Sequence, residues 1–190
     1  HCIEGTATDL VAIFNIDLHG SGLIVRRVQK AAASDEWAKN SENDTDTGDI
    51  ALVKFVGGLP PGYKPAKLLT DVSALKDGAS VLLAGYGISD GVKHTGAETL
   101  RSVVTQIKKA AFSRTEVLLD QTHGKGACHG DSGGPAYVTV NGEQRLFGVT
   151  SRGVDDPNND CSRFSAYTVI PAYTDWMRRT IAAFNSGATP

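Results

Sequence analysis

The ten residues Gly126-Ala127-Cys128-His129-Gly130-Asp131-Ser132-Gly133-Gly134-Pro135 carry the strongest chemical signal in the sequence. Glycines around a serine leave its hydroxyl exposed and let the backbone approach a substrate closely, as a nucleophile requires. The N–H groups of Gly130 and Ser132 can point at one position and bind a developing oxyanion. The bare spacing Gly-x-Ser-x-Gly also occurs in glycine-rich turns. The positions of the histidine and the acid relative to the serine therefore have to distinguish between classes of hydrolase.

The positions of the histidines exclude one class of hydrolase. α/β-Hydrolases place the acid and then the histidine after the serine. The five histidines are His1, His19, His94, His123 and His129, so none follows Ser132. The subtilisin order can be written as Asp49, His94, Ser132, but it needs a helix-rich α/β chain. The remaining order is His1, Asp49, Ser132, in which Asp49 enters the apolar run 50–55 and can be partly buried against an imidazole.

The hydrophobic pattern predicts a β protein with one helix. Short runs of strand character are residues 10–18, 23–28, 50–56, 80–84, 100–107, 117–119, 137–140 and 145–149. Asn141-Gly142 tolerates positive φ and predicts a hairpin between the last two runs. Apolar residues from Ile170 to Phe184 fall at helical spacing, with Pro171 in the first turn. The pattern favours a barrel or sandwich closed by a C-terminal helix.

Composition bounds the possible partners. The 190 residues are 41% hydrophobic and 21% charged, as in soluble globular proteins, and suffice for one domain or two small ones. A net charge of −2 gives no argument for binding nucleic acid or a membrane surface, and we expect neither partner. The acidic segment 35–49 does not match the spacing of a calcium loop. We expect no cofactor and no metal.

The leading His1-Cys2, the run Asp49-Ile50-Ala51-Leu52 and the motif 130–135 together resemble the chymotrypsin-like (trypsin-like) serine peptidases. The resemblance implies two six-stranded antiparallel β-barrels and a C-terminal α-helix. Residues 1–64 would be the remainder of the first barrel, whose N-terminal part is missing, and residues 65–190 the second barrel with the helix. It also implies a secreted or periplasmic serine endopeptidase, made as a zymogen, with protein or peptide substrates.

By this resemblance, Ser132 is the nucleophile, His1 the general base and Asp49 the group that holds the imidazole tautomer. Gly130 and Ser132 form the oxyanion hole. An inactive member of the same fold, serving as a binding or regulatory module, is the main alternative function. A lipase or esterase is chemically conceivable, but no apolar lid segment supports it.

Three cysteines leave one without a partner in the chain. The resemblance pairs Cys128 with Cys161 in a disulfide, and gives Cys2 a partner that precedes the histidine. A zinc site built from His123, Cys128 and His129 is the rival interpretation. It is disfavoured because it would take ligands from the loop beside the nucleophile.

The resemblance also implies that Asp131 pairs with a new amino terminus. A buried carboxylate without a cation is costly, so we expect an upstream segment. That segment would be either a separate chain linked through Cys2 or further sequence of the same chain.

The specificity pocket is expected to be neutral. In this family its base lies six residues before the serine, which is Gly126 here. An acid at that position would select Lys or Arg, so its absence predicts apolar or aromatic side chains. Asp155 and Asp156 are the acids that could still turn into the pocket. The expected substrate-binding residues are Gly126, Ala127, His129, Ser151, Gly153 and Ser165.

Overall fold

The computed structural model describes residues 1–3 and 7–186, which form an open sheet and a closed barrel. The sheet has the order β1-β2-β3 and the barrel the order β4-β5-β6-β9-β8-β7, with every neighbouring pair antiparallel. The strands are β1 (Val11–Phe14), β2 (Ile24–Ala33), β3 (Ala51–Phe55), β4 (Ser80–Gly85), β5 (Arg101–Lys109), β6 (Glu116–Asp120), β7 (Pro135–Val140), β8 (Glu143–Val154) and β9 (Phe164–Val169). The helices are η1 (Ala7–Asp9), α1 (Trp37–Asn40), η2 (Val72–Ala74), η3 (Ile170–Tyr173) and α2 (Thr174–Ser186).

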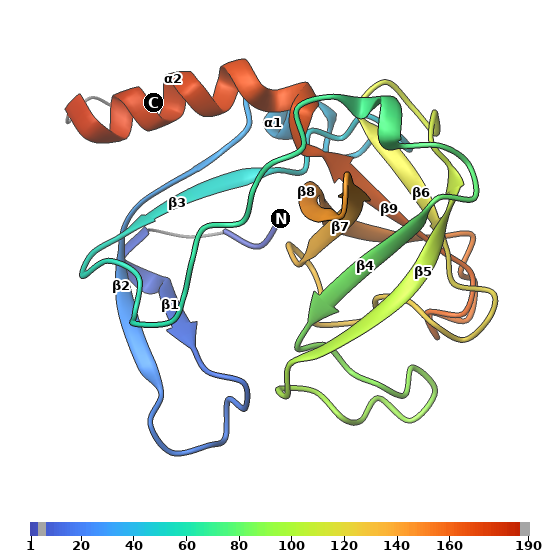
Figure 1. Ribbon diagram of the computed structural model, residues 1–190, viewed down its shortest axis with the longest axis horizontal. Helices are drawn as coiled ribbons and strands as arrows, with labels where there is room; N and C mark the ends of the chain where they lie inside the picture. Colours follow the sequence, from blue (N-terminus) through green and yellow to red (C-terminus); the bar gives the residue numbers. More distant parts are fainter. Residues whose placement is uncertain (4–6, 187–190) are drawn as a thin grey trace.

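The arrangement of these elements places the N-terminus between the sheet and the barrel (Figure 1). Helix α2 leaves the barrel and reaches the sheet, where Lys54 Nζ on β3 donates to the carbonyl of Phe184 at 3.3 Å. Lys30 Nζ on β2 donates to the carbonyl of Ala183 at 3.5 Å. The helix therefore ties the two halves of the molecule together.

The mostly β architecture, the closed six-stranded barrel and the C-terminal helix confirm the fold expected from the sequence. Among the described residues, the N-terminal half is a three-stranded sheet. The boundary at residues 64/65 stays a prediction, and it falls in the connection between β3 and β4. Strand β9 was not predicted. Its last five residues are all buried, including the polar Ser165 and Thr168, so it shows no alternation of apolar and polar residues.

The predicted hairpin and helix are present with one difference. Asn141 and Gly142 have φ of 51° and 77° and connect β7 to β8. Pro171 lies in the 3₁₀ turn η3, so the α-helix begins later, at Thr174. The predicted apolar face is displaced, because Ile181 is 49% exposed and the buried position on that turn is Thr180.

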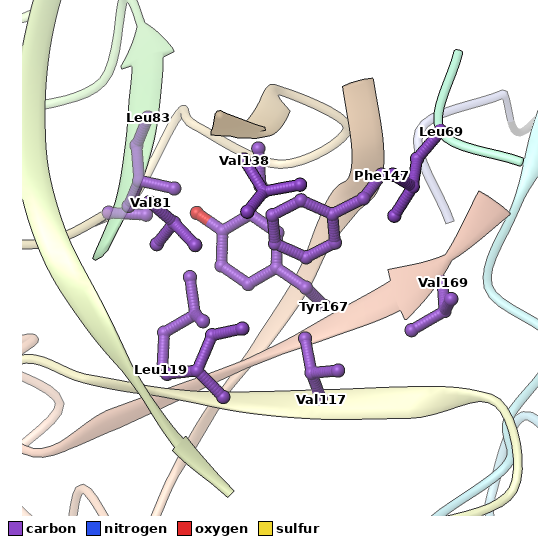
Figure 2. Packing of buried hydrophobic residues seen from close by; sticks show 12 residues of the cluster. Leu69, Val81, Leu83, Val117, Leu119, Val138, Phe147, Tyr167 and Val169 are labelled. Carbon is purple, nitrogen blue, oxygen red and sulfur yellow. The ribbon is translucent and has the colours of Figure 1, made fainter. Parts of the chain in front are cut away.

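The barrel interior holds the main hydrophobic core (Figure 2). Phe147 of β8 and Tyr167 of β9 are fully buried and lie among aliphatic side chains of β4, β6 and β7. Burial raises the pKa of the Tyr167 phenol well above its ordinary value, so it stays neutral. This core fixes strands β8 and β9, which continue into the candidate site.

Replacing Phe147 with alanine is expected to destabilise the fold by about 3–5 kcal/mol, because the barrel cannot collapse around the cavity left behind. Urea unfolding measures the difference. The control is Val92→Ala, at a side chain that is 77% exposed. Equally small losses in the free energy of unfolding for both variants would show that Phe147 does not stabilise the barrel.

No helix in the described part of the chain is both long enough and apolar enough to cross a membrane.

Candidate active site

Asp49 and His1 lie in direct contact at the junction between the sheet and the barrel. The Nδ1 atom of His1 lies 2.6 Å from Asp49 Oδ2, and the main-chain nitrogen of His1 lies 2.7 Å from Oδ1. Ser151 donates its hydroxyl proton to Oδ2 at 2.7 Å. Asp49 is only 7% exposed, so its carboxylate is buried and satisfied by donors from three directions. A carboxylate in this position fixes which imidazole nitrogen carries the proton.

The ring of His1 has a second neighbour. Trp37 of α1 packs against it, with ring centroids 6.3 Å apart at 48°. The chain can reach this position because Gly48 adopts φ of +72°, and a Cβ there would overlap Glu36 and the start of α1. A glycine is therefore required immediately before Asp49.

The loop that carries Asp49 is attached to the barrel by buried charges. Glu116, fully buried at the start of β6, accepts two hydrogen bonds from Arg152, at 2.8 and 2.9 Å. The hydroxyl of Thr47 donates to the same carboxylate at 3.2 Å. Arg152 also donates to the carbonyl of Asp44 at 2.6 Å. These contacts fix the position of Asp49 relative to the barrel.

Asp46 adds a second attachment of the same loop. Its Oδ1 accepts hydrogen bonds from the main chain and hydroxyl of Thr115 and from the hydroxyl of Ser113, at 2.7–2.9 Å. Partial burial raises the pKa of Asp46, but these hydrogen bonds outweigh it and lower the pKa below its ordinary value. The carboxylate is therefore charged at neutral pH and available to hold the loop.

Arg152→Ala is expected to cost about 3–5 kcal/mol of stability, because it leaves the buried Glu116 carboxylate without its cation. The control is Arg145→Ala, whose partner Glu143 is 47% exposed, and which should cost about 1 kcal/mol or less. Thermal or urea unfolding of both variants gives the comparison. A loss for Arg152→Ala no larger than that of the control would contradict this role.

The loop around Ser132 is held by Asp131 and by β8. The carboxylate of Asp131 accepts from the main-chain N–H groups of Gly87 and Cys128, at 2.8 and 2.9 Å. The main-chain N–H of Gly133 donates a hydrogen bond to the carbonyl of Thr150 at 2.9 Å. Ser132 itself is exposed. These contacts hold the loop in place, while Ser132 stays exposed.

Two main-chain donors of this loop are unused. Within the described residues, neither the N–H of Gly130 nor that of Ser132 donates a hydrogen bond. Gly130 has φ of +92°, which few other residues adopt. Unpaired N–H groups on a rigid turn are the donors that an oxyanion needs.

The N-terminal residues lie beside the serine loop. A Cβ built on Gly133 would lie 3.5 Å from the Sγ of Cys2. No hydrogen bond among the described residues joins His1 to Ser132. Contacts between a base and its nucleophile often tighten only when substrate binds. The structure thus brings His1 and Asp49 into contact and places Ser132 on the neighbouring loop.

Four of the six sequence-predicted pocket residues line a small cavity of about 80 Å³. Ala127, His129, Gly153 and Ser165 line it. Ser151, expected in the wall, instead hydrogen-bonds Asp49 through its side chain. The register of the β8–β9 pairing shifts at this residue, between Thr150 and Arg152.

Gly126 does not line this cavity, because the side chain of Gln121 occupies the adjoining space. A Cβ on Gly126 would lie 2.3 Å from Gln121 Cδ. Gln121 is buried, accepts from the main chain of Ala127 at 2.7 Å and donates to the carbonyl of Cys161 at 2.9 Å. Sequence reasoning missed Gln121, since nothing in the local pattern marks it as buried.

The cysteines form one disulfide, between Cys128 and Cys161, with Cα atoms 5.4 Å apart. It joins the serine loop to the segment before β9. A zinc site that uses Cys128 conflicts with this bond, because a bonded sulfur is not a free thiolate ligand. Cys2 is an exposed free thiol. Desolvation raises its pKa above the ordinary value.

A second, larger cavity of about 440 Å³ lies behind the serine loop and is lined by Asp131, Gly87 and Arg101, among other residues. A side chain at position 85 or 87 would overlap the Asp131 carboxylate, which explains the glycines there. Within the described residues, Asp131 forms no ion pair.

Comparison with known proteins supplies the family. A chymotrypsin from Phaedon cochleariae is 26% identical over 94% of this chain and 65% of its own length. Trypsin II-P29 from Gallus gallus is 26% identical over 97% of this chain and 74% of its own length. Chymotrypsin-like elastase family member 1 from Macaca fascicularis is 39% identical over 96% and 73%. The family model described as Trypsin matches residues 1–177, and the chain therefore belongs to the trypsin family of serine proteases.

Proposed function

We propose that this chain is the catalytic part of a serine endopeptidase that works through an acyl-enzyme, with Ser132, His1 and Asp49 as its catalytic residues. The observation that carries the proposal is the buried Asp49 carboxylate in contact with Nδ1 of His1, beside a rigid loop that exposes Ser132. With Nδ1–H committed to Asp49, the other ring nitrogen, Nε2, is free to accept a proton.

The chemistry follows from these positions. Ser132 Oγ attacks the carbonyl carbon of the scissile bond, and Nε2 of His1 takes its proton. The negative charge on the substrate oxygen is stabilised by the N–H groups of Gly130 and Ser132. The imidazolium then protonates the leaving amine, which breaks the C–N bond and leaves an ester on Ser132. A water molecule, deprotonated by His1, hydrolyses that ester and restores the serine.

Asp131 is proposed to pair with a cationic amino terminus. The cavity beside its carboxylate and the lack of an ion pair within the described residues support this pairing. We propose further that Cys2 forms a disulfide with a cysteine outside residues 1–190, and that the protein is secreted and made as a zymogen. The Cys128–Cys161 disulfide supports an oxidising compartment.

The side-chain preference needs separate treatment. The sequence-based prediction of an apolar or aromatic preference rests on the absence of charge at Gly126, Ala127 and Ser165. It stays a prediction.

Labelling with a fluorophosphonate tests the proposed function. The full-length, processed protein should react at Ser132, located by peptide mass spectrometry, and Ser132→Ala should not react. The alternative of a binding or regulatory module predicts no labelling of the wild-type protein. No labelling in a correctly folded and processed sample would reject the catalytic proposal.

A further inference from the structure

Strand β8 breaks its register at Ser151. In the β8–β9 pairing, Thr150 faces Tyr167, and the next paired residue of β8 is Arg152. Ser151 is therefore an extra residue on this strand. Neighbouring side chains of a regular strand point to opposite faces, but a bulge changes the local geometry and can re-aim a side chain. Here the side chains of the two neighbours meet, with Nη1 of Arg152 3.3 Å from Ser151 Oγ.

The Ser151 hydroxyl lies between a carboxylate and a guanidinium. Its Oγ lies 2.7 Å from Asp49 Oδ2 and 3.3 Å from Nη1 of Arg152. A carboxylate only accepts hydrogen bonds, a guanidinium only donates them, and a hydroxyl carries one proton. These two neighbours leave one arrangement, in which Ser151 donates to Asp49 and accepts from Arg152. Ser151 is 6% exposed, so the arrangement is shielded from solvent.

The guanidinium of Arg152 is held from several sides. Both of its terminal nitrogens donate to the buried Glu116 carboxylate, at 2.8 and 2.9 Å. Nη2 also donates to the carbonyl of Asp44 at 2.6 Å. Glu116 is fixed in turn, because the hydroxyl of Thr47 donates to it at 3.2 Å. A planar fork of donors with these partners has little freedom to turn away from Ser151.

The chain of contacts continues from Ser151 to the proposed base. Oδ2 of Asp49 accepts from Ser151 and lies 2.6 Å from Nδ1 of His1. The hydroxyl and the imidazole share this one oxygen, and consecutive hydrogen bonds inside a protein polarise one another. A positive charge behind the Ser151 oxygen therefore strengthens its bond to Asp49 and changes the bond from Asp49 to the imidazole.

We propose that Arg152 is a positioning residue for the catalytic carboxylate, and that it acts on Asp49 through the Ser151 hydroxyl. The inference rests on the proposed protease function. By fixing the bond at Oδ2, Arg152 sets how strongly Asp49 holds the imidazole of His1. The buried ion pair with Glu116 supplies both the place of the guanidinium and the balance of its charge.

Arg152→Lys tests this role. A lysine keeps a positive charge for Glu116, so the buried carboxylate is not left unpaired, but its ammonium cannot reproduce the planar fork. In the full-length, processed protein, kcat should fall about three- to tenfold, the size expected for one hydrogen bond. KM should stay unchanged, because the lost interaction acts on the reaction and not on substrate binding. Urea unfolding checks that the variant is folded.

The pH profile of kcat/KM gives a second readout of the same variant. Its acidic limb should move to higher pH, because a weaker bond from Ser151 leaves more negative charge on Asp49 to stabilise the imidazolium. Arg152→Lys leaves the formal charges at positions 152, 116 and 49 unchanged, so the movement reports the hydrogen bond. The control is Arg145→Lys, at an ion pair whose acid is 47% exposed, which should change neither kcat nor the profile.

The Ser151→Ala background separates the two routes by which Arg152 can reach Asp49. The guanidinium contacts Ser151 directly, and it also contacts the Asp44 carbonyl on the loop that leads to Asp49. Without the hydroxyl, only the route through the loop remains, so adding Arg152→Lys should lower kcat no further. A further fall in the double variant, equal to that of Arg152→Lys alone, would assign the effect to the loop and overturn the inference.

The proton on Nδ1 of His1 gives a readout that needs no turnover. Its NMR resonance, measured with Ser132→Ala to prevent self-cleavage, reports the bond to Asp49. Arg152→Lys should shift this resonance, and in the Ser151→Ala background it should not.

Fluorophosphonate labelling separates failure of this inference from failure of the proposed function. If Arg152→Lys is folded and labelled but leaves both kcat and the resonance unchanged, the inference is overturned and the protease function stands. A folded, processed wild-type protein that is not labelled rejects the protease function instead. The resonance then still decides whether Arg152 acts on the contact between Asp49 and His1.

Discussion

Ser132→Ala is expected to lower kcat for peptide hydrolysis by about 10⁶-fold, a size taken over from serine proteases in which a member of the triad has been removed. The physical reason is that no other group in the site can form the ester. The loop itself should persist, because its contacts run through Asp131, Gly133 and Thr150 rather than through the serine hydroxyl. Steady-state hydrolysis of a cleaved peptide measures the loss.

The control for this variant is Ser80→Ala, which removes an exposed hydroxyl at the start of β4. It should retain wild-type turnover. Substantial activity in Ser132→Ala, from a preparation free of wild-type enzyme, would assign the nucleophile to another residue.

Asp49→Asn is expected to lower kcat by about 10⁴-fold, the loss found for the corresponding acid in the well-studied triad of this family. The contacts explain why an amide is so poor a substitute. If the amide NH₂ replaces Oδ2, it faces Nδ1 of His1 and the Ser151 hydroxyl, and it drives the imidazole proton to Nε2. If the amide NH₂ replaces Oδ1, it faces the main-chain nitrogen of His1, which is also a donor, and that hydrogen bond is lost.

Ser151→Ala serves as the matched comparison, because it removes one donor to Asp49 and leaves the carboxylate in place. Its kcat should fall much less than that of Asp49→Asn. The pH profile of kcat/KM adds a second readout, since Asp49→Asn should shift the acidic limb that reports the imidazole. Equal losses in both variants would contradict the role given to the carboxylate.

The three proposed catalytic residues could be named from the sequence because each lies in a local motif with its own chemistry. Ser132 has its glycines, Asp49 precedes an apolar strand, and the order of the histidines left one arrangement. The structure brings His1 and Asp49 into contact, and the catalytic roles of the three residues are proposals.

The pocket could not be predicted in the same way, because its walls come from segments that meet only in the folded chain. Gln121 bridges two wall segments, accepting from the main chain of Ala127 and donating to the carbonyl of Cys161, and Asp156 lies in the loop that the disulfide anchors. The local sequence around Asp156 contains several other acids, so only the fold distinguishes the buried carboxylate oxygen from the exposed ones. Strand β9 was missed for a related reason, since burial on both faces removes the alternation that marks a strand.

The most direct test of the central claim, that Ser132 and Asp49 act as one unit through His1, is the turnover of the double variant Ser132→Ala/Asp49→Asn. Residues that act as a unit lose activity non-additively. The double variant should therefore keep the same residual rate as Ser132→Ala alone. A further large fall, toward the uncatalysed rate, would contradict the account, because it would show that Asp49 contributes independently of the serine.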